Sequence, residues 1–293
     1  MTENTIDFAS ATLFLPDALE AFEKIVRKPP LPNVVYHYTT ADGLLGILRS
    51  GTIWATNARY MNDASEIIYG RNLVRDVLRE EAEGETGHFR TWLEDFVDLV
   101  ERVHEGHDTY LACFCESGDL LSQWRAYGSG RGFAAGFRGA ALANLEPSTL
   151  LRVEYDPQVQ QGGVRETVRI HLRHLRAAVK EKRGSDVPAI SGAFALMLTL
   201  WVAALKHPSF AEEREWRLMP LAQIYPVLVR SDRGWLRPYI EIPLAPNDGA
   251  TPLVSITHGP SPHPELEKRS LTLVLGERYA DVAINGSSAP LRV

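Results

Sequence analysis

The chain has 293 residues, of which 45% are hydrophobic and 23% are charged, and its formal net charge at pH 7 is −6. This length and composition suit a globular protein with a sizeable core. The acidic balance argues against a protein that coats nucleic acid broadly with positive charge. Residues 163–183 are locally rich in arginine and lysine, and a solvated helix face is the favoured interpretation of that run over a nucleic-acid patch.

The two cysteines, Cys113 and Cys115, lie two positions apart on an expected strand. Their side chains would point the same way but would be too far apart for an easy disulfide, so we expect a reducing compartment. The N-terminus shows no secretion signal, and the apolar stretch 193–205 is too short to span a bilayer. We expect a cytoplasmic protein without membrane contact.

The first expected elements are a helix, a strand and a second, shorter helix. Residues 18–27 have an amphipathic helical pattern, and a proline-rich segment follows them. The β-prone run after the prolines carries His37 between two tyrosines. In the short helix that comes next, Thr40 is the expected N-cap and Gly51 the expected C-terminal glycine.

Helices and strands alternate along the rest of the chain. Helices are expected at 66–83, 89–103, 120–127, 164–182 and 190–206. Strands are expected at 52–57, 110–115, 133–137, 151–155, 216–219, 239–242, 253–257 and 271–275. We predict an N-terminal helix and proline-rich lead-in over residues 1–33. A single α+β domain would follow over residues 34–293, with a twisted, mostly antiparallel central sheet flanked by helices.

Four clusters of polar side chains are candidates for chemistry. They are His37-Tyr38-Thr39, Asn62-Asp63 with Glu66, residues 122–127, and Glu213 with Glu215 and Arg217. Alternate positions of a strand share one face, so the last cluster would place two carboxylates beside a guanidinium. Such a face is either a surface salt-bridge ladder or a site in which one carboxylate accepts a proton or stabilises a cation.

Each cluster also has a structural interpretation. His37 would be a half-buried histidine bonded to the backbone. Trp124 and Tyr127 lie one helical turn apart and would pack on the core. Asn62-Asp63 would form a turn and a helix cap.

The order of these clusters resembles the family catalogued as domain of unknown function 2971. That family has a Tyr-His-Tyr-Thr-like start before an Ile-Leu-x-x-Gly helix, then an Asn-Asp pair before a helix. It continues with a Trp-x-x-Tyr element before an aliphatic strand, and with a lysine followed by Glu-x-Glu-x-Arg. The matching positions are residues 36–39 and 47–51, then Asn62, Asp63 and Glu66, then Trp124, Tyr127 and 133–137, and finally Lys206, Glu213, Glu215 and Arg217. The family name assigns no reaction.

The opening strand and helix are also similar to the start of ADP-ribosyltransferase folds. The resemblance implies that His37 holds the nicotinamide ribose of NAD, and that Glu215, or Glu213 in another register, acts at the anomeric carbon. A carboxylate there would stabilise the oxocarbenium-like charge left when nicotinamide departs. The implied cofactor-binding residues are His37, Tyr38, Thr39, Tyr60, Asn62, Trp124, Tyr127 and Arg217.

The resemblance therefore implies an NAD-dependent ADP-ribosyltransferase-like enzyme, such as a bacterial toxin or phage-defence factor that modifies nucleic acid or protein. Two alternatives stay open. One is a non-catalytic ligand-binding or interaction module built from the same residues. The other is a metal-dependent nuclease or hydrolase that uses Asp63, Glu66 and Glu215, although their spacing does not demand a metal.

Overall fold

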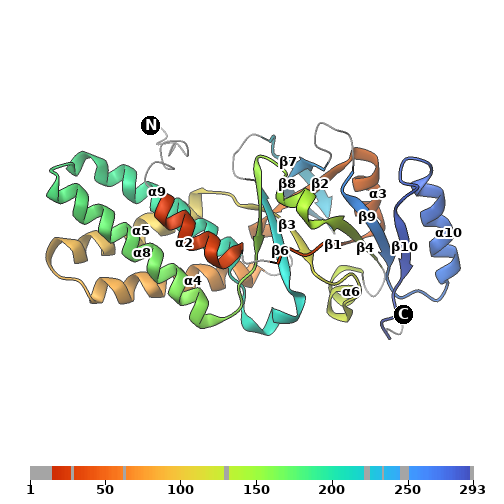
Figure 1. The fold of residues 1–293 in the computed structure, drawn as a ribbon, viewed down its shortest axis with the longest axis horizontal. Coiled ribbons are helices and arrows are strands. Elements are labelled where there is room, and N and C mark those ends of the chain that lie inside the picture. The colour runs from red at the N-terminus through yellow and green to blue at the C-terminus, as the bar shows by residue number, and fades with distance from the viewer. Residues whose placement is uncertain are drawn as a thin grey trace. The chain divides into compact units, whose positions relative to one another are not determined.

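The computed structural model confirms an α+β protein with a mostly antiparallel sheet and flanking helices (Figure 1). It describes residues 15–27, 30–61, 64–128, 132–220, 225–232, 234–244 and 251–290. Contacts divide the chain into two compact units. One combines Met1–Lys28, Asn62–Thr109 and Val153–Phe210, and we call it the helical unit. The other combines Pro29–Met61, Tyr110–Arg152 and Ala211–Val293, and we call it the sheet unit. Each unit gathers separate segments of the chain. The predicted domain boundary at residue 33 stays a prediction.

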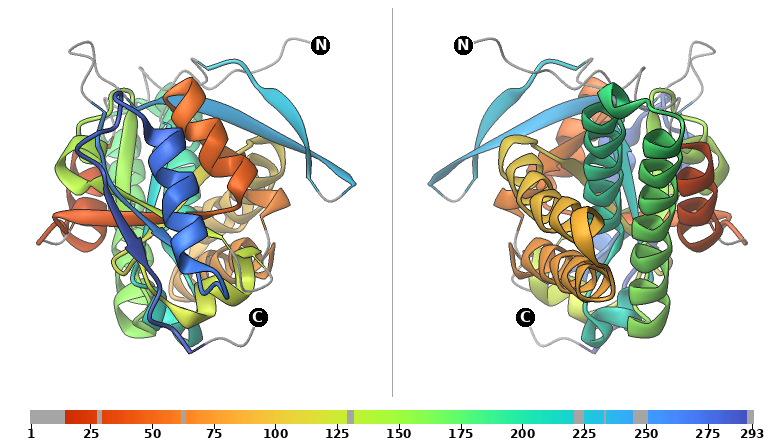
Figure 2. Two further views of the ribbon diagram at one scale, coloured as in Figure 1. Left: turned by 90° about the vertical axis from the view of Figure 1, so that its right-hand side faces the viewer. Right: turned by 90° about the vertical axis from the view of Figure 1, so that its left-hand side faces the viewer.

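The helical unit packs long helices around one apolar helix (Figure 2, right). Its helices are α2 (Pro16–Val26), α4 (Ala64–Glu83), α5 (Gly87–Gly106), α8 (Pro157–Lys180) and α9 (Val187–Ala204). Helix α9 is apolar on all sides and almost wholly buried, and the other helices contact it. Within the described residues, the segment Gly184–Ala204 alone is long and apolar enough to cross a bilayer, but most of it lies inside this unit. A core helix has the same composition.

The sheet unit contains all the strands that the structure describes. They are β1 (Val34–Thr39), β2 (Thr52–Asn57), β3 (Tyr110–Cys115), β4 (Phe133–Arg138), β5 (Ser148–Arg152), β6 (Glu215–Pro220), β7 (Leu228–Asp232), β8 (Trp235–Pro243), β9 (Leu253–His258) and β10 (Ala283–Gly286). Their order is β10-β9-β4-β1-β3-β2-β8-β7, and β6 adds to β3 and carries β5. Pairing is antiparallel except between β9 and β10. Strand β3 is therefore a junction at which β1, β2 and β6 meet.

One face of this sheet carries the main apolar core of the unit. Val35, Ile53, Phe114, Phe137 and Trp216 lie in it. Helices α3 (Ala41–Ser50), α7 (Gly139–Ala143) and α10 (Pro264–Leu275) contribute leucines and an isoleucine to the same cluster. The other face carries a smaller cluster under α6 (Leu121–Gly128). Because side chains alternate along a strand, neighbouring residues of β1 belong to different clusters.

The expected strand at 271–275 is wrong, because these residues form the last turn of α10. Its alternation of leucines resembles a strand, but Leu271 and Leu275 are also one helical turn apart and are the residues that α10 buries. Pro264 at the start and acidic residues in the first turn favour the helix. The structure also starts α8 at Pro157, where Asp156 caps the helix, rather than at residue 164.

Candidate functional site

The candidate site begins where β1 separates from β3. Strand β1 pairs with β4 along its whole length, from Val34 to Thr39. Against β3 it forms one residue pair, Tyr36 with Cys115. Beyond that pair the imidazole of His37 reaches the carbonyl of Cys113, with 2.9 Å between Nδ1 and the oxygen. A side chain therefore bonds to β3 at the place where the backbone ladder stops.

His37 is half-buried, and its ring lies 5.7 Å from that of Phe114. A carbonyl oxygen only accepts hydrogen bonds, so Nδ1 must carry the proton and Nε2 is left as an acceptor. Burial lowers the pKa of His37, the bond to Cys113 opposes that shift, and the positive charge of Arg230 adds to it. The imidazole is thus held neutral, with one nitrogen in a defined role.

Arg230, on β7, lies over two aromatic rings, one on β2 and one on β8. Its guanidinium carbon lies 5.0 Å from the ring centre of Trp54 and 5.8 Å from that of Tyr239. One of its nitrogens donates to the hydroxyl of Thr56 at 3.3 Å. Trp54 in turn donates to Glu241 at 3.2 Å. A cation is thereby fixed in place by cation–π contact and hydrogen bonding.

The sequence reasoning missed Arg230, Trp54 and Tyr239 as site residues. The sequence did offer one signal, since alternation within 52–57 places Trp54 and Thr56 on one face. The strand that carries Arg230 was not expected at all. The position of Arg230 over Trp54 depends on the pairing of β2 with β8 and of β8 with β7, which are long-range contacts.

Tyr38 and Trp124 form a buried aromatic pair on the face of the sheet opposite His37. The Tyr38 hydroxyl donates to the Ser117 carbonyl at 2.9 Å and accepts from the Leu120 amide at 2.8 Å. Burial raises its pKa. Trp124 packs edge-on against Tyr38 at 4.7 Å and donates to Asp119 at 2.7 Å. Both side chains are almost fully buried, as the structural interpretation of Trp124 predicts.

The other predicted cofactor residues lie as follows. Thr39 ends β1 and is half-buried, and its hydroxyl lies against the first turn of α3 at Gly43. Tyr60 is exposed, at the end of a short 3-10 helix. Tyr127 is in the last turn of α6. Asn62 lies outside the described residues, so its predicted role is untested.

Glu215 and Arg217 form a buried ion pair on β6. Nε of Arg217 donates to one carboxylate oxygen at 2.8 Å, and a terminal nitrogen donates to the other at 3.1 Å. Both side chains are nearly inaccessible to solvent. Such a two-pronged contact fixes the orientation of the carboxylate. The structure thus brings these two predicted site residues together.

The structure does not bring His37 and Glu215 to one face of the sheet. Glu215 is paired with Cys115, and Cys115 is paired with Tyr36. Residues paired across antiparallel strands share a face, so Glu215 lies on the face of Tyr36. His37 follows Tyr36 directly and points to the opposite face, where Phe114 lies.

Glu213 lies before β6, in a short 3-10 helix that ends at that residue, so the predicted face of three charged residues is shared by two only. Between them, Arg214 adopts a left-handed backbone conformation with φ of 42°. Its guanidinium lies 3.8 Å from one carboxylate oxygen of Glu116, and the other oxygen accepts a hydrogen bond from Trp216 at 3.1 Å. The turn into β6 is therefore tied to the end of β3.

Glu66 and Lys206, from the second and fourth predicted clusters, form an ion pair within the helical unit. The Lys206 nitrogen lies 2.7 Å from Glu66 and 5.0 Å from the ring centre of Phe210. Both charged side chains are largely buried. Asp63 lies outside the described residues, and no group of three metal-binding side chains occurs among those the structure describes.

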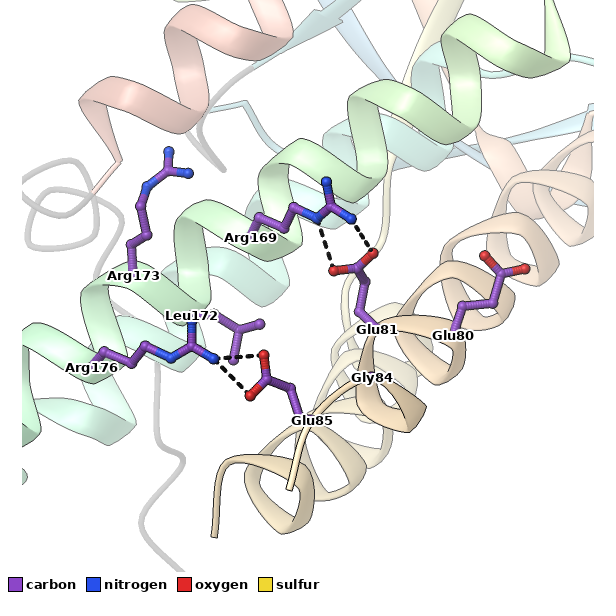
Figure 3. Close-up of a pocket in the computed structure, with 8 residues that line it drawn as sticks. All are labelled: Glu80, Glu81, Gly84, Glu85, Arg169, Leu172, Arg173 and Arg176. Carbon is purple, nitrogen blue, oxygen red and sulfur yellow. Dashed lines mark hydrogen bonds and ion pairs between the residues drawn. The ribbon is translucent and has the colours of Figure 1, made fainter. Parts of the chain in front are cut away.

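The basic run of α8 faces acidic residues of α4 across a hollow of about 430 Å³ (Figure 3). Arg169 contacts Glu81 through two nitrogens at 3.0 and 3.2 Å. Arg176 contacts both carboxylate oxygens of Glu85 at 2.6 Å. Leu172 lies between them. Pairing of this kind neutralises the basic run locally, which agrees with a solvated helix face rather than a nucleic-acid patch.

One segment of the chain matches a known protein family. Residues 123–218 match the model of the family described as protein of unknown function DUF2971. This match supports the resemblance to that family. The matched part includes Trp124, Lys206, Glu213, Glu215 and Arg217, which carried the resemblance in the sequence. No curated protein and no solved structure was found to match the chain.

Proposed function

We propose that this protein binds a nucleotide-type ligand, with NAD as the candidate, beside the point where β1 leaves β3. The observation that carries the proposal is that Arg230 lies close enough to His37 to lower the pKa of its imidazole, which bonds to β3 where the ladder stops. By alternation Arg230 lies with Thr56 on the face of Tyr36, so a ligand would contact both groups at the open end of the β1–β3 ladder. Both groups are fixed by their own neighbours before any ligand arrives. Prearranged groups lower the cost of binding.

The chemistry of these residues suits the parts of a dinucleotide. Nε2 of His37 can accept a hydrogen bond from a ribose hydroxyl. The guanidinium of Arg230 can pair with phosphate oxygens, for which its planar fork is well shaped. Trp54 on β2 and Tyr60 in the short 3-10 helix after β2 supply aromatic surface on which a base could stack. The three kinds of group thus suit a sugar, a phosphate and a base.

A non-catalytic binding module is the function that these residues support best, because binding needs only the fixed imidazole and guanidinium, whereas Glu215 is held in an ion pair with Arg217. The second candidate is an ADP-ribosyltransferase-like enzyme that modifies nucleic acid or protein, as a toxin or defence factor would. The strand–helix unit of β1 and α3 favours it, since this unit carries the resemblance to such enzymes. In that reaction the bond between nicotinamide and ribose breaks, and an acceptor nucleophile bonds to the anomeric carbon and loses a proton. Glu215 or Glu213 would stabilise the intervening cation.

Titration calorimetry with NAD tests the binding proposal. We expect Arg230→Met to weaken binding by about tenfold or more, because a charge-assisted hydrogen bond contributes about 1.5–3 kcal/mol. Arg278→Met is the matched control, since Arg278 also lies over an aromatic ring of the sheet unit, at 5.2 Å from Tyr279. Absence of NAD binding, or equal loss in both variants, would overturn the proposal.

Release of nicotinamide separates the two candidates. An enzyme would release nicotinamide from NAD when an acceptor is supplied, and Glu215→Gln would lose that release while still binding NAD. A binding module would bind NAD and leave it intact under every condition. Folding of Glu215→Gln is checked first by circular dichroism, because this carboxylate is buried in an ion pair.

A further inference from the structure

Asp119 joins two parts of the sheet unit through one carboxylate. It lies in the loop between β3 and α6, and one of its oxygens accepts from the indole of Trp124 at 2.7 Å. The same oxygen accepts from the hydroxyl of Ser287, and the other oxygen accepts from the amide and the hydroxyl of Ser288, both at 2.8 Å. Three of these four hydrogen bonds come from the segment that follows β10. We call this segment, residues 287–290, the C-terminal strap.

The hydrogen bonds favour the charged form of the Asp119 carboxyl. Burial raises the pKa of Asp119, but the bonds from Ser287, Trp124 and Ser288 outweigh burial and hold the pKa below its usual value. Hydrogen bonds to a charged acceptor are stronger than those between neutral groups. One charged group therefore supplies most of what binds the strap.

The strap makes few other contacts. Within the described residues, its last backbone bond to a strand joins the amide of Ser287 to the carbonyl of His258 at 2.9 Å. Ser288 and Pro290 are exposed, and the half-buried Ala289 adds one small side chain to the apolar cluster under α6. Small side chains bury little apolar surface, and the donors of the strap can bond to water instead. Separation of the strap from the body of the sheet unit therefore costs few contacts.

The surface under the strap is fixed by bonds that do not involve the strap. Tyr38 holds the loop that carries Asp119, since its hydroxyl donates to the Ser117 carbonyl at 2.9 Å and accepts from the Leu120 amide at 2.8 Å. Trp124 is bonded to one Asp119 oxygen and packed on Tyr38. Without the strap, this surface would present a placed carboxylate beside the apolar side chains of Leu120 and Trp124. A rigid acceptor of this kind binds a peptide at a lower entropic cost than a mobile one.

We propose that the strap is an internal ligand that covers a peptide-binding site at Asp119, and that an extended segment of a partner protein with two consecutive serines takes its place. The strap shows the chemistry that such a segment needs, which is two hydroxyl donors and one amide donor followed by a small apolar residue. The site is shut while the strap is bound, so release of the strap controls access to it. This site is separate from the ligand site proposed at His37, and its test needs no NAD.

The double variant Ser287→Ala with Ser288→Ala tests the proposal in the full chain, because it removes the two hydroxyl donors of the strap. The probe is a synthetic peptide with the sequence of residues 285–290, blocked at both ends and labelled, whose binding is measured by fluorescence anisotropy. We expect it to bind the double variant about tenfold or more tightly than the unaltered protein, in which the tethered strap competes. Ser185→Ala is the matched control, since it removes a serine–carboxylate bond to Asp186 in the helical unit, and it should bind as the unaltered protein does.

Asp119→Asn in the double variant identifies the acceptor. Asparagine keeps one oxygen for Trp124 but presents a donor where Asp119 accepts from the strap, so peptide binding should weaken by about tenfold or more. Equal binding to the double variant and the unaltered protein would overturn the proposal, as would peptide binding that Asp119→Asn leaves unchanged. A dimer in gel filtration that Asp119→Asn dissociates would also overturn it, because the occupant would then be the strap of a second copy. An unchanged circular dichroism spectrum shows that each variant is folded.

Discussion

His37 and Glu215 point to opposite faces of the sheet, although the strands that carry them both pair with Cys115 of β3. The separation follows from the period of a strand, in which adjacent residues face opposite ways. His37 is bonded to the Cys113 carbonyl, whereas Glu215 is bonded to Arg217. His37 and Glu215 therefore have different neighbours, and the role of each can be tested by its own variants.

Removing either partner of the buried ion pair between Glu215 and Arg217 should strongly destabilise the folded protein. Arg217→Met leaves a buried carboxylate without this cation, and we expect a loss of about 3–5 kcal/mol in the free energy of unfolding. The double variant Glu215→Gln with Arg217→Met should lose less than the sum of the two single variants. Urea denaturation measures all four proteins. Additive losses would mean that the pair is not coupled.

The pKa of His37 should depend on Arg230. Burial and the nearby guanidinium lower this pKa below its ordinary value of about 6.5, so the imidazole stays neutral at pH 7. A lowered histidine pKa reduces stability as the pH falls below about 6.5, because the unfolded chain then binds the proton first. Removing the cation in Arg230→Met should move the pKa of His37 upward.

Nuclear magnetic resonance of the histidine ring carbons measures this shift by titration, with His37→Asn assigning the signal. Arg278→Met serves again as the control and should leave the pKa of His37 where it is. A pKa at or above 6.5 in the unaltered protein, or an equal value in Arg230→Met, would contradict the expected coupling.

The strand–helix unit of β1 and α3 could be predicted from sequence because its signals are local. Thr40 accepts a hydrogen bond from the Gly43 amide at 3.2 Å, and Gly51 has a left-handed φ of 67°. These are the cap and the terminal glycine that the sequence indicates. The opposite orientation of His37 and Glu215 depends on which residues pair across β3. That register is set by long-range packing, so residue types alone do not determine it.

Strand β7 was missed for a related reason. Its two apolar residues, Leu228 and Val229, lie on opposite faces and are both exposed, so the strand shows no alternation between buried apolar and exposed polar positions. Arg230 gains its place over Trp54 only through two steps of strand pairing. Local patterns therefore indicated His37 of the proposed ligand site and overlooked Arg230.

His171, a buried histidine of the helical unit, should make that unit sensitive to acid. His171 lies between the rings of Phe96 at 4.1 Å and Phe194 at 5.0 Å, and burial lowers its pKa to about 3. The folded protein therefore resists protonation, while the unfolded chain takes up a proton below about pH 6.5. Stability should fall as the pH drops through the window from about 6.5 to about 3, by up to about 1.4 kcal/mol per pH unit.

Thermal unfolding monitored at several pH values checks this dependence. His171→Leu should unfold with a weaker dependence on pH across the same window. His88→Gln is the control, since His88 is exposed in the same unit, and it should keep the slope of the unaltered protein. Equal slopes in all three proteins would contradict the assignment of this sensitivity to His171.

Two adjacent glycines of α8 should respond in opposite ways to alanine. At Gly163 an added Cβ would lie 2.3 Å from the Trp201 ring and 2.7 Å from Ile25, whereas at Gly162 it would meet no atom within 4 Å. Gly163→Ala forces Trp201 to move in a packed core, and we expect a loss of about 1–3 kcal/mol. Gly162→Ala should gain up to about 1 kcal/mol from the higher helix propensity of alanine. Urea denaturation of the two variants gives the comparison, and a Gly163→Ala protein as stable as Gly162→Ala would mean that α8 and α9 are less closely packed than the Gly163–Trp201 contact indicates.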